Sequence, residues 1–316
     1  MRISVLLLCL LFSIACAGQD FYLFTGTYTG TGSKGIYVYR FNASTGAATL
    51  LSHTDSVVNP SYLTVSGNDK YVYAVNETNG SDPGRVSAFS FDTKNAKLNF
   101  INSEPTGGDD PCYVTVDKFN KWLIVANYSG GSVSVFPLNK NGSINPHVQL
   151  MQDTGSSINK NRQEKAHVHS AVFSPAQNYL FTPDLGIDKI MIYKFDPTLK
   201  EPLIPSKPPF EFVGEGEGPR HFVFHPNGKF AYVITELSGA ISVYNYQPGK
   251  LKKVQRIITH PEGYAGVIGS ADIHISPDGK FLYSSNRGDE NTITIFSINP
   301  NTGKLTLAGY ESTKGK

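Results

Sequence analysis

The sequence is poor in cysteine, with only three among 316 residues. Cys9 and Cys16 fall within an apolar N-terminal segment, which leaves Cys112 alone in the rest of the chain. One cysteine cannot form a disulfide within a chain, so a small disulfide-stapled fold is excluded. We interpret Cys112 as a small buried side chain rather than a reactive thiol, because free cysteine is commonly buried.

Tryptophan and clusters of one charge are scarce as well. The single tryptophan, Trp122, is followed by leucine, so the Trp-Asp pair of WD-repeat scaffolds is absent. The formal net charge is only +2, without a Lys/Arg run, so we expect no nucleic-acid partner. Neither a Gly-x-Ser-x-Gly elbow nor a zinc-type spacing of His and Cys occurs, so the sequence predicts no metal and no cofactor.

Long apolar runs are confined to the N-terminus. Residues 1–17, MRISVLLLCLLFSIACA, combine the basic Arg2 with a leucine-rich core and with small residues at Ala15 and Ala17. This pattern indicates a secretory signal peptide, and it is too short to span a bilayer. We therefore expect an exported protein, periplasmic or secreted, whose mature domain is 18–316. Cleavage before Cys16, which would give a lipoprotein, is an alternative.

What the chain does contain is a repeat. The stretch 214–244, GEGEGPRHFVFHPNGKFAYVITELSGAISVY, alternates short apolar runs with turn residues such as Asn227-Gly228. A shift of 51 residues reproduces the pattern, with Asp278-Gly279 at the turn. A period of four short strands predicts an all-β propeller, because one blade alone cannot bury both of its faces. A sandwich of unrelated hairpins is the alternative.

The repeat occurs as one partial and five full units. The units cover 21–54, with three strands, and then 60–103, 111–152, 169–212, 219–258 and 270–307. A polar insert, TGSSINKNRQEK, precedes the unit that starts at residue 169. A propeller closes by pairing strands from the two chain ends, and we find no spare strand for the first unit. We therefore expect a single, C-terminally incomplete domain of the seven-bladed type that lacks its last blade. Closure with six blades is the alternative.

Equivalent positions on successive blades should form rings around the propeller axis. One register repeats similar polar residues, as a structural position does: Asn76, Asn127, Asp184, Thr235 and Asn286. A second register varies from blade to blade: Ser61, Cys112, His169, Arg220 and Ala271. A third, sixteen residues later, varies as well: Glu77, Tyr128, Leu185, Glu236 and Arg287. Both variable registers should meet at one mouth of the channel, and their variety is typical of a functional site on a repeated scaffold.

These registers supply the candidate site residues. The predicted catalytic cluster comes from three consecutive blades: His169, Arg220, Glu236 and Arg287. The predicted substrate-binding residues are His167, Glu77 and Tyr128. Arginines bind anionic groups and stabilise oxyanions, whereas Glu and His transfer protons, so the set suits an anionic substrate with a reactive carbonyl. For each charged residue, an ion pair that joins neighbouring blades is the competing interpretation.

Several short motifs resemble a known family. They are GTYT at 26–29, GIYVY at 35–39, GPRH at 218–221, HPNGKFAYV at 225–233, TEL at 235–237 and SSNRG at 284–288. Together they resemble the seven-bladed propeller lactonases, which include propeller-type 6-phosphogluconolactonases and carboxy-cis,cis-muconate lactonizing enzymes. The resemblance runs from residue 21 to the end. The family's functional His, two Arg and Glu then match His169 (or His167), Arg220, Arg287 and Glu236.

The resemblance implies a lactonase that opens a small, anionic sugar lactone. Water attacks the carbonyl carbon, Glu236 or His169 acts as the base, and the arginines bind the oxyanion and the anionic group. A lactonizing cycloisomerase acting on a carboxymuconate-like diacid uses the same residues and stays open. A non-catalytic exported propeller that binds a ligand is the third possibility, and the export signal favours it. The sequence makes no prediction of an oligomeric state.

Overall fold

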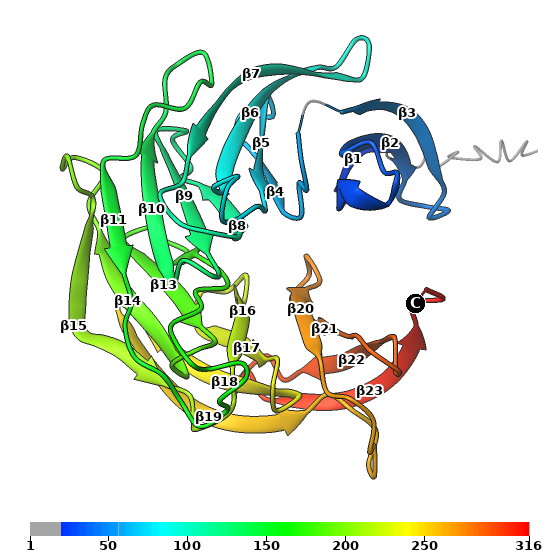
Figure 1. Cartoon of the computed structure of the whole chain (residues 1–316). Coiled ribbons are helices and arrows are strands. Elements are labelled where there is room, and N and C mark those ends of the chain that lie inside the picture. The colour runs from blue at the N-terminus through cyan, green and yellow to red at the C-terminus, as the bar shows by residue number, and fades with distance from the viewer. Residues whose placement is uncertain (1–19, 56, 316) are drawn as a thin grey trace, which may run out of the picture.

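The computed structural model describes residues 20–55 and 57–315, so the predicted signal peptide at 1–17 lies outside the described residues. Within these ranges, strands and one short 3-10 helix make up the regular structure, and the strands form sheets arranged as blades around a common centre (Figure 1). The predicted all-β propeller is therefore confirmed. Among the described residues, no helix has the length and apolar character that a membrane crossing requires.

The blades follow the chain in order, and neighbouring strands within each blade are antiparallel. The first blade has three strands, with the helix η1 (Thr29–Thr31) between the first two: β1 (Asp20–Gly26), β2 (Ile36–Asn42) and β3 (Ala48–Thr54). The second blade has four: β4 (Leu63–Val65), β5 (Tyr71–Asn76), β6 (Arg85–Asp92) and β7 (Lys97–Pro105). The third is β8 (Pro111–Val116), β9 (Trp122–Asn127), β10 (Ser132–Pro137) and β11 (Gln149–Gln152).

The remaining three blades also have four strands each. The fourth blade is β12 (Val172–Phe173), β13 (Tyr179–Asp184), β14 (Lys189–Phe195) and β15 (Leu203–Phe212). The fifth is β16 (Pro219–Phe224), β17 (Phe230–Thr235), β18 (Ala240–Gln247) and β19 (Lys250–Ile258). The sixth is β20 (Ser270–Ile275), β21 (Phe281–Asn286), β22 (Thr292–Ile298) and β23 (Leu305–Ser312). The first strands β4, β8, β16 and β20 of their blades lie nearest the centre (Figure 1).

The expectation of a seven-bladed type with one blade missing is wrong, because the described residues form six blades. None of their sheets combines strands from the two ends of the chain, and the first blade stays three-stranded instead of borrowing a strand. The first blade packs against the second blade. Phe24 of β1 joins a cluster that includes Ile36, Val72 and Phe89.

The core lies between blades, and the middle strands show why. Every residue of β17 is buried. Tyr232 packs in a cluster with strands of the sixth blade, whereas Val233 packs in a cluster with strands of the fourth. Successive side chains of a strand point to opposite faces, so a strand covered on both sides is apolar throughout.

The repeated polar register has a structural role. Its members close the second strands of the four-stranded blades and are buried: Asn76, Asn127, Asp184, Thr235 and Asn286. The amide of Asn127 donates to the hydroxyls of Ser132 and Ser134 at 3.0 and 2.9 Å, so it joins the second strand to the third. Buried polar groups need such partners, which explains why the position keeps a short polar side chain.

Candidate active site

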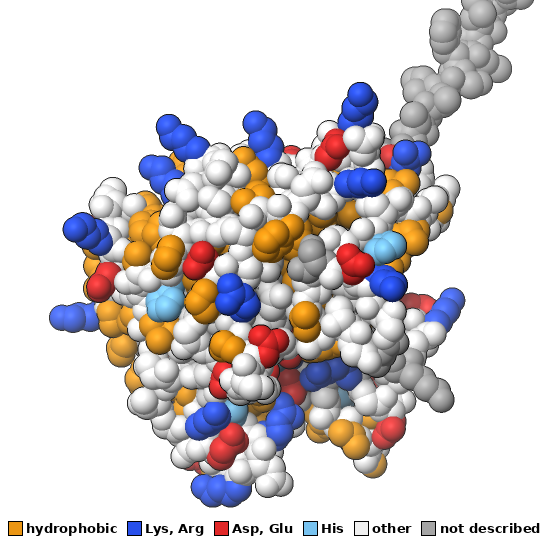
Figure 2. All heavy atoms as spheres, turned by 45° about the horizontal axis from the view of Figure 1, so that its top comes forward, with side chains coloured by type: hydrophobic (Ala, Val, Ile, Leu, Met, Phe, Trp, Pro, Cys, Tyr) orange, Lys and Arg blue, Asp and Glu red, His pale blue; other side chains and the backbone are white. Residues whose placement is uncertain are grey.

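A cavity of about 480 Å³ lies where the variable registers meet. All residues of the second register line it: Ser61, Cys112, His169, Arg220 and Ala271. Four residues of the third register line it too: Glu77, Tyr128, Glu236 and Arg287. Leu185, the fifth, is fully buried. Figure 2 shows acidic and basic side chains side by side around a hollow on the visible face.

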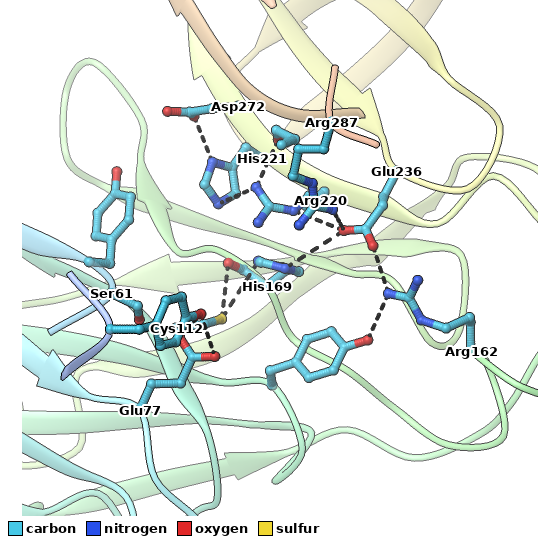
Figure 3. Close-up of a pocket in the computed structure, with 14 residues that line it drawn as sticks. Ser61, Glu77, Cys112, Arg162, His169, Arg220, His221, Glu236, Asp272 and Arg287 are labelled. Carbon is cyan, nitrogen blue, oxygen red and sulfur yellow. Dashed lines mark hydrogen bonds and ion pairs between the residues drawn. The ribbon is translucent and has the colours of Figure 1, made fainter. Parts of the chain in front are cut away.

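A β-bulge directs the side chains of the second register, to which Arg220 belongs, into the cavity. Pairing between β16 and β17 shifts between Pro219 and His221, so Arg220 falls outside the regular ladder. The inner strands β8 and β20 have an irregularity at the equivalent point. A bulge bends its strand and re-aims the side chain of the extra residue. Arg220 accordingly points toward Glu236 (Figure 3).

One backbone hydrogen bond, repeated from blade to blade, fixes the third register, to which Glu236 and Arg287 belong. The N–H of Glu236 donates to the carbonyl of Gly218 at 2.8 Å, and the N–H of Arg287 donates to the carbonyl of Gly269 at 3.1 Å. The same bond, over the same spacing of eighteen residues, fixes Glu77, Tyr128 and Leu185. The blades therefore present different side chains from equivalent backbone positions.

Glu236 is the centre of the charged cluster. Its Oε2 accepts from Nε of Arg220 at 2.9 Å and lies 3.1 Å from Nη2 of Arg287. Its Oε1 accepts from Nη2 of Arg162 at 2.6 Å. Arg220 and Arg287 lie together on the Oε2 side of this carboxylate, whereas Arg162 approaches Oε1 from another side (Figure 3). The cluster therefore carries an excess of positive charge.

The arginines also set the protonation state of Glu236. Burial alone would raise the pKa of this carboxyl, but Arg220 and Arg287 outweigh it and lower the pKa below its usual range. Arg162 adds to the same effect. Glu236 is therefore ionised at neutral pH, although only 4% of the residue is exposed.

A second acidic group fixes Arg220 through a histidine. Nδ1 of His221 lies 2.7 Å from Oδ1 of Asp272, and Nη1 of Arg220 lies 3.3 Å from Nε2 of His221. Burial, followed by the nearby Arg220, lowers the pKa of His221 to about 4, so the ring is neutral at pH 7. Because Arg220 can only donate, we assign the single ring proton to Nδ1, which faces the carboxylate. Nη1 also donates to the carbonyl of Ala271 at 2.9 Å.

His169 lies in the cavity beside Glu236. Its Nε2 is 3.9 Å from Oε2 of Glu236, and its Nδ1 is 3.6 Å from Sγ of Cys112. Burial and then the charge of Arg220 lower the pKa of His169 well below its usual value, so the imidazole is neutral. Burial raises the pKa of the Cys112 thiol, which therefore stays protonated. This agrees with the interpretation of Cys112 as a buried, unreactive side chain.

His167 lies differently. Its ring stacks on Tyr128 with centroids 4.5 Å apart, and its nitrogens lie 3.1 Å from the Tyr128 carbonyl and 3.1 Å from Glu164. It is not part of the cavity lining, whereas His169 is. Of the two histidines in AHVH, the structure thus places His169 beside the charged cluster.

The other two predicted binding residues, Glu77 and Tyr128, line the cavity at different places. Glu77 accepts hydrogen bonds from the Tyr28 hydroxyl, at 3.0 Å to each carboxyl oxygen, and burial raises its pKa. The hydroxyl of Tyr128 accepts from Nη2 of Arg162 at 3.2 Å. Glu77 therefore stands apart from the arginine cluster, whereas Tyr128 adjoins it.

Five residues that line the cavity were not among the site residues predicted from the sequence: Tyr28, Tyr62, Arg162, His221 and Asp272. Arg162 comes from the polar insert that interrupts the repeat, and Tyr28 comes from the GTYT motif of the first blade. The only signal for Arg162 was the insert itself, since a loop that departs from a repeat often carries function. Across the described part of the chain, no group of three or more His, Cys, Asp or Glu is placed to hold a metal ion.

Fold and site together describe a β-propeller whose cavity holds three arginines around one buried glutamate. The sequence model of the family described as "Lactonase, 7-bladed beta-propeller" matches residues 22–316. The chain belongs to this family of lactonase propellers. The family description gives seven blades, whereas residues 20–55 and 57–315 form six.

Individual relatives agree with this assignment. The chain is 42% identical to a 6-phosphogluconolactonase of Formosa agariphila over 296 residues, which are 93% of this chain and 84% of that protein. It is 35% identical to the 6-phosphogluconolactonase of Bacillus subtilis over 294 residues, 92% of this chain and 82% of that protein. The structure of a periplasmic gluconolactonase from Pseudomonas aeruginosa matches with 37% identity and a TM-score of 0.88, over 94% of this chain and 84% of that one.

Proposed function

We propose that this protein is a lactonase that opens a sugar lactone by base-assisted attack of water on the ring ester. One observation carries the proposal: the buried, ionised Glu236 lies among three arginines at 2.6–3.1 Å, next to the neutral His169. Such a group combines a proton acceptor with donors for a developing oxyanion. Membership of the lactonase family and the names of the relatives support it.

The attacking water is activated between Glu236 and His169. Oε2 and Nε2 are 3.9 Å apart, so one water oxygen in the cavity can lie within hydrogen-bond distance of both. Glu236 takes the proton, because it is the ionised group, while the oxygen attacks the lactone carbonyl carbon. His169 forms a hydrogen bond to the water through Nε2 and orients it toward the carbonyl carbon.

Arg220 stabilises the tetrahedral oxyanion. Its guanidinium is fixed beforehand by Glu236, by the Ala271 carbonyl and by His221, and preorganised donors need no rearrangement during the reaction. Collapse of the intermediate breaks the bond between the carbonyl carbon and the ring oxygen. Glu236 returns the proton to that leaving oxygen, and the product is a hydroxy acid.

We further propose that the reaction takes place outside the cytoplasm. The signal-like residues 1–17 and the similarity to a periplasmic gluconolactonase support this. An exported enzyme meets extracellular sugar lactones, so the need for a phosphate group must be tested directly. A signal-peptide fusion to a periplasmic reporter checks the export, and retention of the fusion in the cytoplasm would refute it.

The deciding experiment measures hydrolysis of gluconolactone and of freshly generated 6-phosphogluconolactone, each corrected for spontaneous opening. Mature protein is compared with an Arg220→Ala variant. Turnover that depends on Arg220 supports the lactonase. A folded protein that opens neither lactone would favour a binding propeller, and turnover of a carboxymuconate instead would favour the lactonizing reaction.

A further inference from the structure

The polar insert between β11 and β12 is anchored to the fourth blade. Gln163 is fully buried, and its amide donates to the Leu185 carbonyl at 2.9 Å and to Oδ1 of Asp188 at 2.8 Å. Ser157 donates to Oδ2 of Asp188 at 2.5 Å. Asp188 is itself buried, so these contacts fix the loop from the interior side. The position of the insert is thereby determined by packing rather than by solvent.

These contacts place Arg162, which is next to Gln163, in the lining of the cavity. A single nitrogen, Nη2, contacts both Oε1 of Glu236 and the Tyr128 hydroxyl. Among the described residues, Nε and Nη1 of Arg162 have no hydrogen-bond partner. The Arg162 side chain is 41% exposed, against 14% for Arg220. Arg162 therefore reaches the charged cluster from the solvent side with donors to spare.

The cluster of Arg162, Arg220, Arg287 and Glu236 has more positive than negative charge, so it can bind an anion. Glu236 is shared by three guanidinium groups, and Arg220 is already fixed by further partners. Arg162 has only Glu236 and Tyr128 to leave, and Glu236 stays paired with Arg220 and Arg287 when Arg162 moves, so no buried charge is left unpaired. A guanidinium binds phosphoryl and carboxylate groups with two parallel hydrogen bonds, more strongly than one nitrogen binds one carboxyl oxygen.

We infer that Arg162 determines substrate specificity by leaving Glu236 to bind an anionic substituent of the lactone, phosphoryl or carboxylate. The inference rests on the proposed lactonase function. When Arg162 moves to the substrate, Glu236 loses one of its three cations and becomes a better proton acceptor. Binding of the substrate's anionic group therefore makes Glu236 more basic. Recognition by the solvent-exposed Arg162 is in this way coupled to the attack of water on the carbonyl carbon.

The test compares three lactones: 6-phosphogluconolactone, the carboxylate-bearing glucarolactone and the neutral gluconolactone. For Arg162→Gln we expect kcat/KM to fall by about 10- to 100-fold on an anionic lactone, mainly through KM, because a charge-assisted hydrogen bond is lost. On the neutral lactone we expect no loss and a higher kcat, because Glu236 in this variant has permanently lost one of its three cations. Arg162→Lys should recover part of the anionic activity. Comparing the two anionic lactones identifies the group recognised.

Arg256→Gln is the matched control, since Arg256 is 39% exposed and pairs with Glu217 away from the cavity lining. Equal losses on neutral and anionic lactones, or no loss on either, would overturn the inference. A wild-type enzyme that opens only the neutral lactone would also overturn it and leave the lactonase standing. A wild-type protein that opens none of the lactones would instead contradict the proposed function.

Discussion

Nε of Arg220 and Oε2 of Glu236 are 2.9 Å apart. Arg220 lies near the start of β16, the inner strand of the fifth blade, whereas Glu236 directly follows β17, the second strand of that blade. The hairpin β16–β17 brings them together at the same end of the blade, and the bulge before His221 turns Arg220 toward its partner. This pair lies at the centre of the candidate site. Four of the five predictions concern the pair itself or the residues around it.

Arg220→Ala should reduce kcat for lactone hydrolysis by about 10²- to 10³-fold, the usual effect of losing an oxyanion donor. Steady-state kinetics on gluconolactone check this, with circular dichroism to verify the fold. Arg256→Ala serves as the control, because it removes an arginine outside the cavity lining. An unchanged kcat in Arg220→Ala would remove Arg220 from the mechanism.

Glu236→Gln should lower kcat by about 10²- to 10⁴-fold, because an amide cannot accept the proton from water. Its shape is close to that of the native side chain, so the fold should persist. Rapid assays with 6-phosphogluconolactone and gluconolactone measure the loss. Activity within a few-fold of wild type would assign the base to another group, with His169 the nearest.

The pH dependence follows from the lowered pKa of Glu236. Because the arginines outweigh burial, the carboxylate stays ionised below the usual range of a glutamate, and activity should persist into mildly acidic solution. Arg287→Gln removes one cation, so the pKa of Glu236 should rise and the acid limb of kcat/KM should move to higher pH. A limb that stays in place in Arg287→Gln would show that another group controls it.

The two histidines of AHVH should behave differently on substitution. His169→Asn is expected to lower kcat by about 10²-fold, since it removes a ring nitrogen beside the reacting water. His167→Asn should change kcat by less than about fivefold, because that ring contacts Glu164 and Tyr128 rather than the cavity. The reverse order of effects would make His167 the functional histidine.

Stability should fall as pH rises from about 4 to about 6, through a buried acid pair away from the active site. Burial raises the pKa of Asp153 to about 6, and burial together with Asp153 raises the pKa of Asp184. The unfolded chain releases these protons at lower pH, so the folded state is penalised as pH rises, by about 1.4 kcal/mol per pKa unit.

Asp153→Asn should weaken this dependence. Thermal unfolding of wild type, of Asp153→Asn and of the exposed control Asp82→Asn at pH 5 and pH 7.5 provides the measurement. We expect the difference in Tm between the two pH values to shrink only in Asp153→Asn. A difference that is the same in all three proteins would place the acid-sensitive group elsewhere.

Much of the fold was accessible from the sequence because blades are local structures. The Asn227-Gly228 and Asp278-Gly279 turns, the alternating apolar runs and the 51-residue spacing located the strands of the six units. The same spacing placed Arg220, Glu236 and Arg287 at one mouth, since equivalent backbone positions lie at one height on every blade. The sequence located six units but led us to expect a seven-bladed type, because the packing of the first blade cannot be inferred from that blade's own pattern.

By itself, the sequence determined the repeat, and with it the all-β architecture and the two registers that line the cavity. Tertiary structure alone decided that Arg162 joins Glu236, that His169 rather than His167 lies in the cavity, and that the first blade remains three-stranded. The physical reason is one of range. Hydrophobic periodicity and turn chemistry act between neighbours in the chain, whereas an insert that breaks the period finds its place only through buried contacts with distant strands.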